Sequence, residues 1–197
     1  LEKFQDDDGN PDPAKIEQEK FRWLEFYKVK FKGSWYTRLF DKLVLRTHTE
    51  FGFLGAFNND RGVIPFDRFF LGGDGMSQYA MDGRETISLR GYPNQSLSTQ
   101  DGSTIYNRFS LELRYPITLK PAASIFGLTF LETGQGYNSF REFNPFNGKR
   151  SLGLGLRIFM PAFGLLGIDF GYGLDAVNDF DLTPNGWETH FVIGQQF

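Results

Sequence analysis

The chain has 197 residues with a net charge of −3, no Cys, 23 Phe and 23 Gly, and 17% of its residues are aromatic. No stretch approaches the roughly 20 consecutive apolar residues that a membrane-spanning helix needs, which excludes helical spanning. The lack of cysteine excludes disulfides, thiol catalysis and Cys-ligated metal sites, and no concentrated basic face indicates nucleic acid. Abundant Gly and aromatics with negative mean hydropathy are typical of a membrane β-barrel. A soluble β-sandwich is the alternative.

The first 20 residues are strongly acidic, with seven acids against three lysines, which predicts a solvated loop. Oxygen-bearing side chains between Asp6 and Glu17 have a spacing similar to that of a calcium loop. Pro11 stands at the turn position that Gly normally holds, so an acidic loop without a metal is the favoured interpretation. The chain begins with Leu1 instead of Met, and we interpret it as an internal fragment of a longer protein.

Seven later segments have the two-residue alternation of β-strands. The clearest is 104–117, where Leu111 and Leu113 share one face while Arg108 and Glu112 share the other. In 123–134 both faces are apolar, so alternation alone does not assign its inner side. The predicted strands are 21–36, 42–57, 104–117, 123–134, 151–160, 163–175 and 186–197.

The connections alternate strictly between long and short. From the first strand onward they are 37–41 (short), 58–103 (very long), 117–122 (short), 135–150 (long), 160–163 (very short) and 175–186 (long). This parity predicts up-and-down strands with one plain end and one elaborate end, and the long loops of outer-membrane barrels are extracellular. The strands also reach the ~9–11 residues needed to cross a membrane.

The predicted fold class is therefore all-β, an antiparallel transmembrane β-barrel. Residues 1–20 would be an acidic extracellular loop, and residues 21–197 would be the C-terminal part of the barrel with the long loop 58–103. A bacterial barrel has an even number of strands, and an open edge cannot face lipid. We therefore expect the N-terminal strands to belong to a part of the protein that this chain lacks.

Two motifs carry a family resemblance. Leu89-Arg90-Gly91-Tyr92 lies in the long loop, and the last predicted strand ends on an aromatic residue, Phe197. Together with the segments around them, they resemble the BamA-type outer-membrane protein assembly factors of the surface-antigen/bacterial insertase superfamily. That family has a Val/Leu-Arg-Gly-Phe/Tyr motif in its sixth extracellular loop and a barrel of sixteen strands. Exoprotein translocation pores and the chloroplast import channel share the motif.

The resemblance implies that the loop folds back into the barrel interior, where Arg90 contacts Glu112 and Glu132. Alternation places Glu112 on a polar face. Glu132 has the same parity as Leu128 and Phe130, which would turn it outward. We still expect Glu132 inside, because an unpaired carboxylate facing lipid is costly. A surface turn without a partner for the arginine is the alternative.

In this motif, each residue type suits its expected role. A guanidinium is a planar fork of donors that suits carboxylates. Gly91 permits a turn or a close backbone approach, and Tyr92 supplies a packing ring with a polar tip.

The family resemblance further implies a function without bond chemistry or a cofactor: folding and insertion of other outer-membrane proteins through a seam between the first and last barrel strands. The terminal strand would carry both the sorting signal and the seam, through Phe191, Ile193, Gly194 and Phe197. Implied partners are nascent outer-membrane proteins, accessory lipoproteins, outer-membrane lipid and periplasmic domains of the same chain, with no nucleic acid. A polypeptide-translocating pore, a passive channel and an enzyme barrel are the alternatives.

The remaining chemical signals are weak. Glu112 and Glu132 could form an acid–base pair, but no nucleophile with a base accompanies them in the sequence. His48 and His190 lie in separate strands without companion ligands and are interpreted as structural. The alternating glycines of 151–160 and 163–175 lie on one face, where they would leave room for an inserted loop or permit the strands to bend.

Overall fold

The computed structural model describes residues 12, 26–57, 63, 67–75, 84–120, 122–161, 164–178 and 182–194. Within these ranges no helix is long and apolar enough to cross a membrane. The described chain forms β1 (Phe26–Phe40), β2 (Leu43–Ala56), β3 (Phe69–Leu71), β4 (Glu85–Ile87), β5 (Ile105–Lys120), β6 (Ala123–Tyr137), β7 (Lys149–Met160), β8 (Gly164–Gly173) and β9 (Gly186–Gly194).

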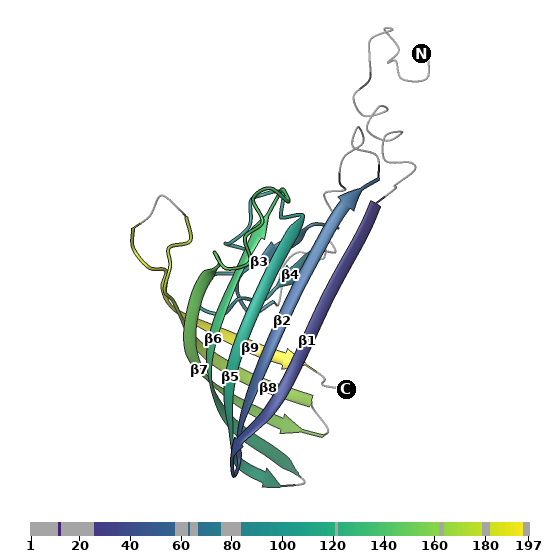
Figure 1. Ribbon diagram of the computed structural model, residues 1–197. Coiled ribbons are helices and arrows are strands. Elements are labelled where there is room, and N and C mark those ends of the chain that lie inside the picture. The colour runs from purple at the N-terminus through teal and green to yellow at the C-terminus, as the bar shows by residue number, and fades with distance from the viewer. Residues whose placement is uncertain are drawn as a thin grey trace.

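Seven long strands form one curved antiparallel sheet in the order β1-β2-β5-β6-β7-β8-β9 (Figure 1). Among the described residues, β1 and β9 are its two edges and do not pair with each other. The sheet is therefore an unclosed part of a barrel, and the predicted fold class is confirmed. The predicted boundary between residues 20 and 21 falls outside the described ranges and stays a prediction.

Several strands extend past the C-terminal bounds that the alternation predicted. β1 continues to Phe40, so the turn to β2 contains only Asp41 and Lys42. β5 continues to Lys120, past a register shift between Pro116 and Thr118. Proline has no N–H for the ladder, which explains why the pairing is irregular there although the strand does not end.

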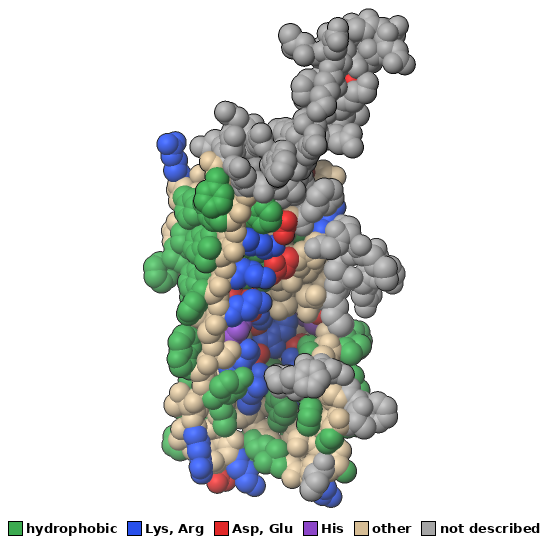
Figure 2. All heavy atoms as spheres, turned by 90° about the vertical axis from the view of Figure 1, so that its right-hand side faces the viewer, with side chains coloured by type: hydrophobic (Ala, Val, Ile, Leu, Met, Phe, Trp, Pro, Cys, Tyr) green, Lys and Arg blue, Asp and Glu red, His purple; other side chains and the backbone are tan. Residues whose placement is uncertain are grey.

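The two faces of the sheet differ sharply in chemistry. Large apolar side chains on the outer face are exposed, including Val29, Phe31, Trp35, Leu113, Tyr115, Leu131, Leu154, Phe170 and Trp187. Buried polar side chains line the inner face, including His48, Glu50, Arg108, Glu112, Glu132, Arg157, Asp169 and His190. Figure 2 shows charged and histidine side chains gathered in the hollow of the sheet. An apolar exterior around a polar interior is the pattern of a barrel that spans a membrane.

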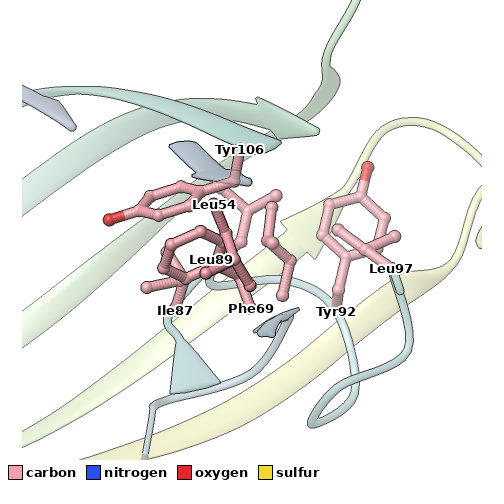
Figure 3. Packing of buried hydrophobic residues seen from close by; sticks show 8 residues of the cluster. Leu54, Phe69, Ile87, Leu89, Tyr92, Leu97 and Tyr106 are labelled. Atoms are coloured by element: carbon pink, nitrogen blue, oxygen red, sulfur yellow. The ribbon is translucent and has the colours of Figure 1, made fainter. Parts of the chain in front are cut away.

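The long connection between β2 and β5 is folded, which the sequence did not predict. Its strands β3 and β4 form a parallel pair. Leu89 pairs with Gly73 through two backbone hydrogen bonds of 3.0 and 3.1 Å. The buried side chains of this loop pack with two residues of the barrel wall in one apolar cluster (Figure 3), formed by Leu54, Phe69, Leu71, Ile87, Leu89, Tyr92, Leu97 and Tyr106. This cluster holds the loop segment 84–103 against the inner side of β2 and β5.

Candidate functional site in the barrel interior

The loop motif occupies the inside of the sheet, and its two apolar residues fix its position. Leu89 and Tyr92 are fully buried in the apolar cluster. Arg90 between them has 5% of its surface exposed. Gly91 has a φ of +86°, in the left-handed region that glycine adopts at low cost. Apolar anchors on either side thus direct the arginine toward the barrel wall.

Three strands supply carboxylates to Arg90. Its Nη2 lies 2.7 Å from Glu112 Oε1 of β5 and 2.5 Å from Glu132 Oε1 of β6. Its Nη1 lies 3.2 Å from Asp169 Oδ2 of β8. The backbone N–H of Arg90 donates to Glu132 Oε2 at 3.0 Å. The structure thus brings together the two acids named from the sequence, and it adds a third.

Asp169 was missed by the sequence analysis, although a signal existed. It lies on the glycine face of the predicted strand 163–175, between Gly167 and Gly171, and the only other charged residue on that face is Asp175 at the strand's end. A carboxylate between glycines on an inner face indicates a partner from another segment, since a buried charge needs pairing. In the structure its side chain is completely buried.

Glu132 faces inward together with the apolar residues that share its parity. Leu128 and Phe130 are 5% and 1% exposed, whereas Leu131 on the other face is 55% exposed. An apolar ring on the inner face of β6 has a partner there: the Arg90 guanidinium lies over the Phe130 ring, 3.7 Å from its centroid. An arginine over an aromatic face is a favourable cation–π contact. The assumption that apolar parity means the lipid side is therefore wrong for this strand.

Additional arginines balance the three acids. Arg157 binds Asp169 with two bonds of 2.6 Å, and Arg114 binds Glu112 Oε2 through Nε at 2.9 Å and Nη2 at 2.6 Å. Arg108 bridges Glu132 at 2.7 Å and Glu50 of β2 at 3.2 Å. Each carboxylate around Arg90 therefore has a second cationic partner. A buried ionic network of this kind fixes one arrangement of its members, since removing one member leaves charges unpaired.

The polar groups of Gly91 are bound by residues near the chain's last strand. Its N–H donates to His190 Nε2 at 2.8 Å, and its carbonyl accepts from Asn185 Nδ2 at 2.9 Å. Gly171 and Gly173 permit this approach, because Cβ atoms built on them would lie 2.6 Å from Gly91 N and 2.4 Å from Gly91 O. The glycine face of β8 thus accommodates the loop backbone.

Tyr92 ties the loop to the long-loop end of the sheet. Its hydroxyl donates to the carbonyl of Arg150 at 2.7 Å and accepts from the backbone N–H of Asp175 at 3.3 Å. Burial raises the pKa of Tyr92 to about 12, so the hydroxyl keeps its proton at neutral pH.

Both histidines have hydrogen-bonding partners, which is compatible with the structural role expected for them from the sequence. His190 accepts from the loop, as described above. His48 lies between Ser34 and Glu50: its Nδ1 is 2.6 Å from Ser34 Oγ and its Nε2 is 2.6 Å from Glu50 Oε1. The sequence contains a signal for the second contact. His48 and Glu50 are two positions apart in the predicted strand 42–57, so their side chains lie on the same face.

Three of the four residues named for the terminal strand lie within the described chain. Phe191 and Ile193 lie on the outer face, 52% and 69% exposed. A Cβ built on Gly194 would have no neighbour within 4 Å. Phe197 lies outside the described residues, as does the acidic segment 1–20 except for Asp12.

The unclosed curved sheet, apolar outside and charged inside with an inserted loop, defines the C-terminal part of a transmembrane β-barrel. Residues 16–197 match the Omp85 superfamily domain. The chain belongs to the Omp85 superfamily, and the predicted resemblance to BamA-type proteins is confirmed.

A solved structure has the same fold: BamA from Haemophilus ducreyi lacking POTRA domains 1–3, with a TM-score of 0.60 and 20% sequence identity. The match covers 85% of this chain and 35% of that one, so the chain spans about a third of the solved protein. No curated protein matches the chain.

Proposed function

We propose that this chain is the C-terminal part of the membrane module of a bacterial outer-membrane protein that folds and inserts other β-barrels. The observation that carries the proposal is the binding of Arg90 by Glu112, Glu132 and Asp169 inside the barrel. The loop is thereby held inside the barrel next to the last strand. Membership of the Omp85 superfamily supports a role in barrel assembly or polypeptide translocation.

The proposed working surface is the edge of β9. Within the described chain β9 pairs with β8 alone, so its other edge has backbone donors and acceptors available for a client strand. An extended client segment would add to this edge by β-augmentation. Gly194 lacks a side chain to pack and weakens the end of the strand. Phe191 and Ile193 face the lipid side, beside the place where a client would enter the membrane.

The proposed partners follow from this surface. Nascent outer-membrane proteins would bind the β9 edge, and the apolar outer face would contact outer-membrane lipid. Accessory lipoproteins and periplasmic domains of the same protein would act from the plain end of the barrel, where the strand turns are short.

A vesicle assay tests the proposal. The intact protein is reconstituted into lipid vesicles, an unfolded client barrel is added, and the folded fraction is followed by protease protection and by its altered electrophoretic mobility. An Ile193→Cys variant offers a single thiol in this chain, since the sequence has no cysteine. We expect disulfide formation with a cysteine in the terminal strand of the client. A client that enters the vesicle interior without becoming membrane-embedded would contradict insertion and favour the translocating pore.

Two alternatives have separate tests. A translocating pore would be distinguished by periplasmic repeats on the N-terminal side of the barrel in the full protein, of which five would indicate assembly and two would indicate secretion. A hydrolytic barrel is favoured by the hydrogen-bonded row of Ser34, His48 and Glu50. If Ser34→Ala or Glu112→Gln abolished an ester or peptide hydrolysis activity while the barrel still folded, the hydrolytic interpretation would replace ours.

A further inference from the structure

The Gly91 peptide groups have an unusual pair of partners. Both groups lie inside the barrel, and both are bound by side chains of one short segment. The Gly91 N–H donates to His190 of β9, and the Gly91 carbonyl accepts from Asn185 just before that strand. Among the described residues, neither side chain forms a hydrogen bond or an ion pair with Arg90. The loop is therefore attached to the terminal strand independently of its ionic attachment to β5, β6 and β8.

The direction of the bond fixes the protonation state of His190. A backbone N–H can only donate, so Nε2 of His190 must accept and cannot carry a proton. The imidazole is then neutral with its proton on Nδ1. If Nε2 also gained a proton, it would present an N–H to the N–H of Gly91, and the hydrogen bond would be lost.

The surroundings of His190 contain both signs of charge. Asp169 lies directly opposite it in the β8–β9 ladder and is already bound by arginines. Glu188 lies on the same face of β9, and Asp74 and Arg90 face it from the loop. Asp74, Arg90 and Asp169 border a cavity of about 200 Å³ beside His190. A cavity of this volume with polar walls can hold water, which gives a proton a route to the imidazole.

We propose that His190, assisted by Asn185, is a positioning residue that latches the terminal strand to the Gly91 peptide only while its imidazole is neutral. Acidification that protonates the imidazole then releases β9 from the loop while Arg90 keeps the loop in the barrel. The consequence for client entry rests on the proposed function, because it assumes that the edge of β9 is the working surface. The latch itself is a property of the fold.

Deuterium exchange of the Gly91 amide tests the latch directly. The intact protein in a bilayer is compared at pH 7.5 and pH 5.0, with rates corrected for intrinsic exchange. We expect protection at pH 7.5 and about tenfold faster exchange at pH 5.0, the scale of one lost hydrogen bond. His190→Leu, which has no acceptor, should exchange fast at both pH values. His190→Gln offers a carbonyl acceptor that does not titrate, so protection should be rescued and become independent of pH.

The chain supplies a matched control. It contains two histidines, and His48 is buried in β2, where its ring nitrogens are bound to Ser34 and Glu50 and not to Gly91. His48→Gln should therefore keep the pH dependence of the unmodified protein. Equal protection of Gly91 in His190→Leu and the unmodified protein would overturn the latch, as would a pH dependence that persists in His190→Gln.

A spectroscopic measurement needs no destabilising variant. Imidazole ¹⁵N shifts of His190, assigned by their loss in His190→Gln, should show a neutral ring protonated on Nδ1 at pH 7.5. A ring protonated on Nε2 at that pH would refute the latch even if client insertion were observed. Conversely, failure of the vesicle assay with an intact exchange pattern would reject the proposed function and leave the latch standing.

Discussion

The long wall of the sheet and its terminal edge hold neighbouring residues of the same loop by different means. β5 and β6 contain 16 and 15 residues, whereas β8 and β9 contain 10 and 9. The wall holds Arg90 through buried charges on Glu112 and Glu132. The last strand holds Gly91 through a neutral hydrogen bond from the loop to His190.

This difference separates what is fixed from what can be released. A buried ion pair is costly to break, because its partner is left charged without water. A neutral hydrogen bond has a net value of only about 0.5–1.5 kcal/mol. The strand with the weaker attachment also has an edge without a partner in the described sheet. The arginine therefore anchors the loop, and the glycine next to it links that anchor to the part of the barrel most able to move.

The largest expected effect is that of Arg90→Ala. The variant leaves three buried carboxylates short of one cation, a loss on the order of 3–5 kcal/mol. The barrel should remain embedded in the membrane because its outer face is unchanged, but loop 58–103 should become sensitive to protease. Arg141→Ala is the matched control, since Arg141 is exposed in the connection between β6 and β7. If protection of the loop were the same in both variants, the anchoring role of Arg90 would be wrong.

A smaller effect should separate the two wall acids. Glu132 accepts from the backbone and the side chain of Arg90 and from Arg108, and its side chain is completely buried. Glu112 shares its charge with Arg114, whose side chain is 21% exposed. We expect Glu132→Gln to cost about 2–3 kcal/mol and Glu112→Gln about 1–2 kcal/mol. Chemical denaturation in detergent micelles gives the comparison, and a reversed order would contradict the greater isolation of Glu132.

The sequence predicts the wall better than the contacts within it. Alternation in β5 is clean because that strand has lipid on one side and charged groups on the other, and it assigned Glu112 correctly to the inner face. The same rule failed for β6, because its inner face packs against the Arg90 guanidinium through Phe130. Alternation shows only which face of a strand is polar and which is apolar. In β6 the apolar face is turned inward, because the loop inside the barrel places the Arg90 guanidinium against the Phe130 ring.

Alternation could not predict contacts between distant segments either, because these contacts also depend on how the loop packs inside the barrel. Arg90 and Asp169 are 79 positions apart, and Gly91 and His190 are 99 positions apart. Their meeting depends on how far the loop enters the barrel, which is set by the packing of Leu89 and Tyr92 with the wall. The family resemblance supplied Glu112 and Glu132 as partners. It named neither Asp169 nor His190, although both lie on faces that alternation had already separated from the apolar side.

The glycines of the terminal strands provide a third test. A side chain forced into a filled space there is expected to lower the free energy of unfolding by about 1–3 kcal/mol. A Cβ on Gly171 would lie 2.6 Å from the backbone nitrogen of Gly91, whereas a Cβ on Gly194 would meet nothing within 4 Å. Gly171→Ala should therefore lower the unfolding temperature and expose the loop to protease. Gly194→Ala should be close to neutral on both measurements. Equal behaviour of the two variants would mean that the loop does not need the close approach along β8.

The smallest effect is expected for Tyr92→Phe, which keeps the buried ring and removes only its hydroxyl. The carbonyl of Arg150 retains a bond from the backbone of Leu174 at 2.9 Å, so only the N–H of Asp175 loses its partner. We expect a loss of about 0.5–1 kcal/mol in unfolding free energy, with faster deuterium exchange confined to Asp175. An effect as large as that of Arg90→Ala would contradict this assignment. It would place the main attachment of the loop at the long-loop end of β7 and β8, where the Tyr92 hydroxyl forms two neutral hydrogen bonds with the backbone.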